Sequence, residues 1–307
     1  MSQGPRSRHN NRRNQPKQKN VERSNSTDEQ NPVVKAFQEY ARELDSKHDR
    51  YERIVKLSRD ITIEAKRIIF LLHTIDGRKD NRTKVLEEAE QRLNKVIEFN
   101  FKSVAQELIG QDPYQYRCAY SPGLQEFIEA YSFMEYFKFG NEGTDALSDW
   151  NVLQDKMVYE NSGKEISEAT DFSQKSVDDT SNDKIESAPM DKDNINNFKF
   201  LVDPTEYILG VADLTGELMR RCINSLGSGE TVVCLETCKV LQQFYTGYVS
   251  LNVQRCRELS RKIYTMRQSL LKTENVCYNV KVRGGEAAKW GAVFENKISD
   301  DLDEGFY

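Results

Sequence analysis

The chain has 307 residues, of which 37% are hydrophobic and 30% charged, and it is long enough to bury a substantial core. Only seven prolines occur, and none falls within residues 33–112 or 205–307. Because proline interrupts helices and is common in the turns of β-proteins, these proline-free stretches indicate long amphipathic helices. They exclude a many-stranded sandwich or barrel.

Two further classes of protein, membrane-spanning and secreted, are excluded. The longest uncharged apolar run, Ile68–Ile75, is far shorter than the roughly 20 residues that span a bilayer, so we expect no membrane association. The polar, basic N-terminus does not resemble a secretory signal. Six cysteines in a chain of this kind are typical of reduced thiols in the cytoplasm or nucleus, and we expect both locations.

Charge is distributed unevenly. Residues 1–31 carry a net charge of +4, residues 159–197 carry −6 and residues 295–307 carry −4, so the remainder carries +1. The net charge of −5 therefore does not exclude a nucleic-acid partner. The composition predicts a disordered basic tail (1–31), a helical domain (32–290) with a flexible acidic insert (159–197), and an acidic C-terminal tail (291–307). The basic tail is either a nuclear-import signal or simply a solvated segment.

Apolar residues recur at helical spacing along the domain, which predicts an all-α bundle of about seven helices without strands or repeats. The first helix carries a heptad pattern from Val34 to Leu72. The expected helices cover residues 33–75, 86–108, 121–140, 145–158, 204–226, 230–247 and 253–282.

Helix boundaries are marked by capping residues. Ser121 and Pro122 are typical of an N-cap and a first helical position. Asp203, Pro204 and Glu206 form the same signal with a capping-box glutamate. Gly227 would then end that helix.

Carboxylates interrupt two strongly apolar helices. Glu126 and Glu129 are three residues apart, and Asp213 and Glu217 are four apart, so each pair lies on one side of its helix. Gly210 flanks the second pair, as does Gly216. A glycine inside a helix destabilises it by about 1 kcal/mol relative to alanine, so two of them suggest close approach by a backbone, a metal or a ligand.

If both helices face one cavity, four carboxylates converge there without histidine or cysteine. Such like charges need compensating cations, and an all-oxygen set favours Mg²⁺, with Mn²⁺ as the alternative. The competing interpretation is a solvated face or ion pairs, with Arg220 or Arg221 neutralising the second pair. Spacing alone leaves both open.

Two more patterns bear on metal and nucleic-acid binding. Cys234 and Cys238 are one helical turn apart but lack a second Cys/His pair, which argues against zinc. Residues 253–283 carry a net charge of +6, with Tyr264 and Tyr278 interleaved. This helix is either a phosphate-binding face with stacking aromatics or a solvated face whose tyrosines belong to the core.

Four long blocks resemble the translin superfamily, in particular its members that associate with translin. The resemblance covers roughly residues 33–290. The blocks are HDRYERIVKLSRDITIEAKRIIFLLH (48–73), GLQEFIEA (123–130), YILGVADLTGELMRRCINSLG (207–227) and SLLKTENVCYNVKVRGGE (269–286).

The resemblance implies a hetero-oligomer with translin that encloses RNA. It also implies that the chain is the catalytic subunit of a Mg²⁺-dependent endoribonuclease, acting on single-stranded RNA in passenger-strand removal during small-RNA silencing and in tRNA processing. The family's acidic residues correspond to Glu126, Glu129, Asp213 and Glu217. We expect Glu129 and Glu217 to contact metal, with the other two completing the site or positioning water.

The insert and the N-terminal tail depart from the family pattern but leave the four carboxylates intact. One alternative is a non-catalytic partner that stabilises translin in a complex binding single-stranded RNA or DNA. Another is a helical-bundle metal oxidase, against which the missing histidines count.

Overall fold

The computed structural model describes residues 31–76, 80–139, 149–160, 197–227, 229–251 and 256–283. The predicted tails and the interior of the predicted acidic insert lie outside these residues. The chain divides into two units, residues 1–49 and 50–307, and each is described by itself.

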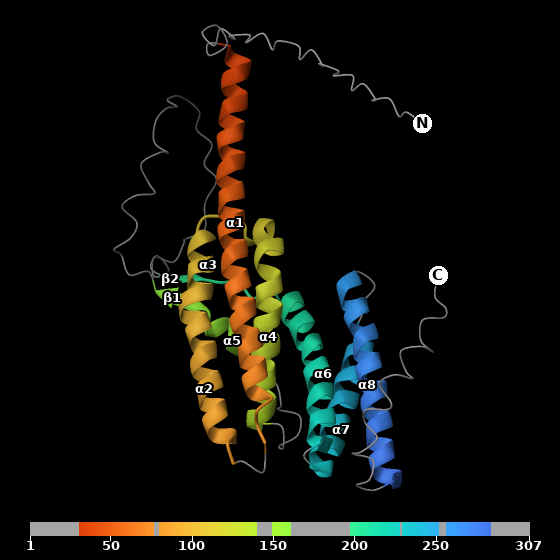
Figure 1. The fold of residues 1–307 in the computed structure, drawn as a ribbon. Helices are drawn as coiled ribbons and strands as arrows, with labels where there is room; N and C mark the ends of the chain where they lie inside the picture. Colours follow the sequence, from red (N-terminus) through yellow and green to blue (C-terminus); the bar gives the residue numbers. More distant parts are fainter. Residues whose placement is uncertain are drawn as a thin grey trace, which may run out of the picture. The chain divides into compact units, whose positions relative to one another are not determined.

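The all-α prediction is confirmed (Figure 1). A π-helical segment, η1, joins α2 to α3 without a loop, so the described residues form seven helical segments besides the short 3-10 helix η2. The elements are α1 (Pro32–Leu72), α2 (Arg82–Lys95), η1 (Val96–Phe101), α3 (Lys102–Glu107), η2 (Pro113–Tyr116), α4 (Arg117–Phe139), α5 (Trp150–Asp155), α6 (Pro204–Gly227), α7 (Thr231–Ser250) and α8 (Arg257–Arg283).

The predicted start of α4 was wrong. The helix begins at Arg117, and Pro122 lies inside it. The reason is the preceding η2, which leads directly into α4. The N-cap of η2 is Asp112, whose side chain accepts a hydrogen bond from the backbone N–H of Tyr114.

The start of α6 was predicted in part. Asp203 caps the helix by accepting a hydrogen bond from the backbone N–H of Thr205 at 2.6 Å. Glu206, in contrast, is buried and forms an ion pair with Arg117 instead of a capping box. The helix ends at Gly227, as expected.

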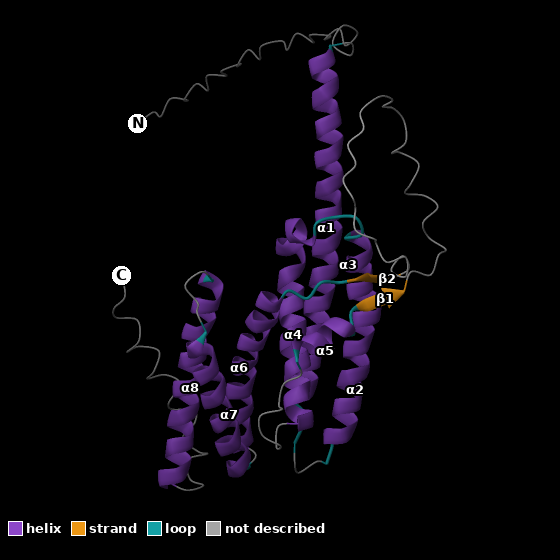
Figure 2. Cartoon of the chain, turned by 180° about the vertical axis from the view of Figure 1, so that it is seen from behind, coloured by secondary structure: helices purple, strands orange, loops and turns teal. Residues whose placement is uncertain are grey.

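A small antiparallel sheet corrects the expectation that no strands occur (Figure 2). Strand β1 (Val158–Glu160) pairs with β2 (Asn197–Lys199), and Tyr159 lies opposite Phe198. The sheet therefore joins the two ends of the predicted insert. Three residues per strand are too few to show an alternating pattern in the sequence.

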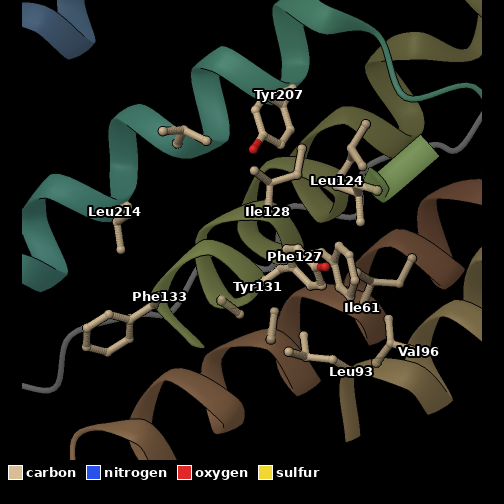
Figure 3. Packing of buried hydrophobic residues seen from close by; sticks show 14 of the residues in the cluster. Ile61, Leu93, Val96, Leu124, Phe127, Ile128, Tyr131, Phe133, Tyr207 and Leu214 are labelled. Atoms are coloured by element: carbon tan, nitrogen blue, oxygen red, sulfur yellow. The ribbon is translucent and has the colours of Figure 1, made fainter. Parts of the chain in front are cut away.

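In the unit of residues 50–307, α4 is the central element of the core. Its buried side chains lie on all sides of the helix, because nine of the fourteen residues from 124 to 137 are apolar or aromatic. Figure 3 shows Phe127 lying toward Ile61 of α1, and Ile128 lying toward Tyr207 of α6. The same core includes Leu93 of α2. The helix that carries the first pair of predicted acids is thus held from several sides.

In the unit of residues 1–49, the described part of α1 exposes a row of large apolar side chains. Val33, Phe37, Tyr40 and Leu44 are each about 60% exposed or more, with Tyr40 the lowest at 59%. They follow the spacing of a helical face that packs against another helix. The part of the chain that the structure describes contains no helix with the length and hydropathy needed to cross a bilayer.

The close approach of α4 and α6 depends on Gly210. A Cβ atom at this position would lie 2.6 Å from Cβ of Ile128 and 2.9 Å from the backbone oxygen of Gln125. Gly216, further along α6, would meet nothing within 4 Å. Of the two glycines that the sequence singled out, only Gly210 marks a close approach within this chain.

We predict opposite effects for alanine at these positions. Gly210→Ala should lower the free energy of unfolding by about 1–3 kcal/mol, because α6 must move away from α4. Gly216→Ala is the matched control, and it should be neutral or stabilising by up to about 1 kcal/mol through higher helix propensity. Urea denaturation followed by circular dichroism measures both. Equal effects for the two variants would contradict the proposed close approach.

Candidate functional site

The packing of α4 against α6 brings the four predicted carboxylates into one region. Burial raises the pKa of Glu129 to about 8, and the charges of Asp213, Glu126 and Glu217 contribute to that rise. The charges of these residues therefore influence one another, as expected if both helices face one region. In the described part of the chain, however, no three of them hold carboxylate oxygens within 4.8 Å of one another.

Of the four carboxylates, Glu129 has its negative charge least compensated by neighbouring cations. Its carboxylate makes no hydrogen bond or ion pair with any residue that the structure describes, and only the more distant charge of Lys262 lowers its pKa. The side chain is partly buried. A buried, unpaired carboxylate among other carboxylates is unfavourable when ionised, and it is relieved by a proton or by a cation.

Asp213 is held by a lysine from a third helix. Lys262 Nζ of α8 lies 2.5 Å from Asp213 Oδ2, and it also donates to Gln125 Oε1 at 2.6 Å and to the backbone oxygen of Leu209 at 3.1 Å. Burial raises the pKa of Asp213, whereas the hydrogen bond and charge of Lys262 lower it. Lys262 thus connects α4, α6 and α8 at the site.

Glu217 has a histidine neighbour, which corrects the expectation of a site without histidine. His73 Nε2, from the turn after α1, lies 2.5 Å from Glu217 Oε2, and the imidazole packs against Phe133 with ring centroids 4.9 Å apart. His73 Nδ1 is buried and has no hydrogen-bond partner among the described residues. Arg220 also contacts Glu217 at 3.1 Å, as the ion-pair interpretation predicted.

Glu126 is the most loosely held of the three paired acids. Lys66 Nζ of α1 lies 3.7 Å from Glu126 Oε2, and more than half of the lysine side chain is exposed. Burial raises the pKa of Glu126, and Lys66 lowers it. An exposed pair at this distance stabilises the fold by well under about 1 kcal/mol.

A second polar network lies beside the site. The buried carboxylate of Glu206 pairs with Arg117 at 2.5 Å and accepts hydrogen bonds from Ser121 and Gln125 at 2.6 and 2.7 Å. Gln125 in turn accepts a hydrogen bond from Lys262. Hydrogen bonds therefore run from the start of α4 to the lysine that compensates Asp213, and they fix its position.

Sequence reasoning missed His73, Lys66 and Gln125. His73 lies inside the apolar run at the end of the first helix, and a single histidine among apolar residues could have indicated a buried polar contact. Lys66 and Gln125 carry no comparable signal, because their partners come from other helices.

Both tyrosines on the basic helix α8 are exposed. Tyr264 is 58% exposed and Tyr278 is 66% exposed, so neither belongs to the core. Arg257, Arg261 and Arg267 are also exposed on this helix. The arrangement suits phosphate and base contacts, and the interpretation that places the tyrosines in the core is wrong.

The charges of the four carboxylates are compensated unevenly. Four carboxylates face three cationic side chains and one histidine, and Glu129 remains without a partner among the described residues. Oxygen ligands of this kind suit Mg²⁺ or Mn²⁺.

The raised pKa of Glu129 predicts a pH-dependent effect of its substitution. A folded-state pKa of about 8, above the unfolded value of 4.5, means that the folded state holds the extra proton, so this group destabilises the fold as pH rises from about 5 to 8. Glu129→Gln should therefore stabilise the protein at pH 8 relative to pH 5, by on the order of 2 kcal/mol.

Denaturation of wild type and variant at pH 5, 6.5 and 8 measures this difference. Glu98→Gln, an exposed acid on η1, is the control and should show no such trend. A Glu129→Gln effect that does not change with pH would mean that Glu129 is ionised normally.

The four carboxylates occur in a chain with close relatives in sequence. Translin-associated protein X of Pongo abelii and that of Mus musculus are each 41% identical over 260 residues, which is 84% of this chain and 81% of theirs. The Translin-associated protein X homolog of Schizosaccharomyces pombe is 26% identical over 250 residues, or 78% of this chain and 84% of that protein.

Solved structures share the fold. The crystal structure of AfC3PO has a TM-score of 0.52 at 20% identity, and the AfC3PO–duplex RNA complex has a TM-score of 0.52 at 19% identity. Each comparison covers 81% of this chain and 98% of the other. The model of the Translin family matches residues 49–284, which include all four carboxylates. The chain therefore belongs to the Translin family.

Proposed function

We propose that this chain assembles with translin and is the catalytic subunit of a Mg²⁺-dependent endoribonuclease that cleaves single-stranded RNA. The proposal depends above all on Glu129, a partly buried carboxylate that has no hydrogen-bond or ion-pair partner among the described residues and that interacts with the charges of three other acids on α4 and α6. The names of the relatives support the translin partner, and the RNA complex of a structural neighbour supports an RNA substrate.

The carboxylates fit a divalent cation by their chemistry. Their oxygens are hard ligands, and the charge around Glu129 is incompletely compensated. Glu129 and Glu217 would hold Mg²⁺ or Mn²⁺ directly, with Glu126 and Asp213 completing the site or positioning water. When bound, the ion would promote ionisation of a water and offset the charge that develops on the phosphodiester.

Residues around the carboxylates would hold them in place, and residues of α8 would bind the RNA. Lys262 holds Asp213 in one orientation by also binding Gln125 and Leu209. His73 holds Glu217 through its Oε2 atom. The exposed arginines and tyrosines of α8 would bind the phosphates and stack on unpaired bases, which suits single-stranded RNA and would also admit single-stranded DNA.

The family resemblance suggests the biological setting. We propose that the complex acts in passenger-strand removal in small-RNA silencing and in tRNA processing, in the cytoplasm and the nucleus. Fractionation of cells that express the tagged chain tests the two locations.

The alternative is a non-catalytic subunit that stabilises a translin complex. The ion pairs of Asp213, Glu126 and Glu217 favour it, because paired acids also serve purely structural roles. A catalytic assay separates the two functions.

We predict that the complex with translin cleaves a labelled single-stranded RNA in Mg²⁺ and not in EDTA. Glu129→Gln combined with Asp213→Asn should lower the cleavage rate by about 100-fold or more, since the acids act directly on the reaction. Size-exclusion chromatography and RNA binding of the variant should match wild type.

Glu98→Gln is the matched control and should cleave at the wild-type rate. If the double variant cuts RNA as fast as wild type, the carboxylates are structural and the non-catalytic alternative holds.

The exposed apolar row on α1 predicts where a partner binds. Phe37→Asp combined with Leu44→Asp should lower co-purification with translin by about tenfold or more, because both side chains are exposed in this chain and suit a helix–helix interface. Glu39→Gln, an exposed polar residue on the same helix, serves as control. Unchanged recovery of the complex would place the interface elsewhere.

A further inference from the structure

Four of the six cysteines gather in one buried cluster. Cys222 comes from α6, Cys234 and Cys238 from α7, and Cys277 from α8, and each is at most 7% exposed. Figure 1 shows these three helices side by side. The sequence suggested only the pair on α7, because Cys222 and Cys277 are brought in by folding.

Cys234 is the centre of the cluster. Its sulfur lies 3.1 Å from Sγ of Cys222 and 3.4 Å from Sγ of Cys277, and all three sulfurs lie within 4.8 Å of one another. Cys238, one turn later on α7, packs into the same cluster and interacts with Cys277. Partly buried apolar side chains packed against the cluster are Leu226, Leu235 and Val276.

We propose that this cluster is a thiolate site for one Zn²⁺ ion, with Cys222, Cys234 and Cys277 as ligands and Cys238 as the fourth. Zn²⁺ favours four sulfur ligands in tetrahedral geometry, and it has no redox chemistry. Binding converts four thiols to thiolates and releases four protons, so no oxidant or reductant is needed.

The distances from the sulfur of Cys234 to those of Cys222 and Cys277 are close to those that zinc requires. The sulfur of Cys238 lies outside the group of three that falls within 4.8 Å, so its side chain must turn toward them. With Zn–S bonds of about 2.3 Å, tetrahedral ligands lie about 3.8 Å apart. The two short sulfur contacts must therefore widen by roughly 0.4–0.7 Å, which rotation of the cysteine side chains provides. The thiols of Cys222 and Cys277 now donate to the backbone oxygen of Cys234, at 3.5 and 3.6 Å, which is the arrangement of protonated ligands.

A disulfide or simple apolar packing would account for the cluster less fully. A disulfide would use two sulfurs and leave two buried thiols without a role. Packing of cysteine as a small apolar residue does not call for four of them from three helices around one point. A metal ion that favours thiolates uses all four.

The site would act on the fold next to the carboxylates. Cys222 follows Glu217 by five residues on α6, and α8 carries both Cys277 and Lys262. An ion shared by α6, α7 and α8 would fix α6 relative to α8, and hence Asp213 beside Lys262. This role does not depend on the proposed nuclease activity.

The test is a metal titration of the 307-residue chain, purified with reductant and stripped with a chelator. The intense sulfur-to-cobalt absorption and the tetrahedral visible bands should saturate at one equivalent of Co²⁺, and Zn²⁺ should displace the ion that gives them. Zn²⁺ should also raise Tm. Cys222→Ser combined with Cys277→Ser should abolish the cobalt spectrum.

Two controls make the test specific. Cys118→Ser combined with Cys256→Ser changes the two cysteines outside the cluster and should leave the spectrum and stoichiometry unchanged. Glu129→Gln combined with Asp213→Asn should also leave them unchanged, which separates this site from the carboxylates.

Three results would overturn the proposal. The first is wild-type chain without sulfur-to-cobalt absorption, a result that needs no variant to fold. The second is metal binding lost in the carboxylate variant and retained in the Cys222/Cys277 variant. The third is a disulfide, seen by mass spectrometry, that forms in wild type while Zn²⁺ does not bind.

Discussion

The contact between Gly210 of α6 and Ile128 of α4 is the constraint on which the rest of the candidate site depends. Any larger side chain at Gly210 would separate the two helices, because its Cβ would overlap Ile128 and the backbone of Gln125. At this separation, the carboxylates of Glu129 and Asp213 are close enough for the charge of one to shift the protonation of the other. Tight apolar packing therefore brings like charges together, and cationic or hydrogen-bonding residues around them must compensate the repulsion.

The residues that compensate these charges come mainly from other helices. Lys262 of α8 neutralises Asp213, and its position is fixed by Gln125, which is itself hydrogen-bonded to Glu206, a buried carboxylate paired with the partly exposed Arg117. Because Glu206 is buried, removal of Arg117 would leave its charge without a cationic partner and would destabilise the fold. Glu129 is left outside this compensation. That imbalance supports the proposed cation site, since a purely structural cluster would gain from pairing every acid.

The sequence predicted most of the helices and singled out the four acids, but it did not predict the residues around those acids or the small sheet. Helical periodicity, Asp203 and Gly227 located α6 almost to the residue, and the acids stood out because they interrupt apolar helices. The start of α4 was predicted too late because Pro122 is typical of a first helical position. The sequence does not show that the 3-10 helix η2 leads into α4 before this proline. The contacts of His73, the pairing of Lys262 with Asp213, and the cysteine cluster all depend on distant segments, for which local spacing carries no information.

The two candidate metal sites differ in ligand chemistry while sharing α6. Carboxylate oxygens near its middle suit a hard, exchangeable ion such as Mg²⁺, and the thiols in its last turns and on α7 and α8 suit an ion held tightly by sulfur. This division separates two tasks. An ion that takes part in hydrolysis must admit water and substrate, whereas an ion that holds helices together must exclude them. The partial exposure of Asp213 and the full burial of Cys222 and Cys234 agree with that division. Rigid packing at the C-terminal end of α6 would then support the geometry of the open site at its middle.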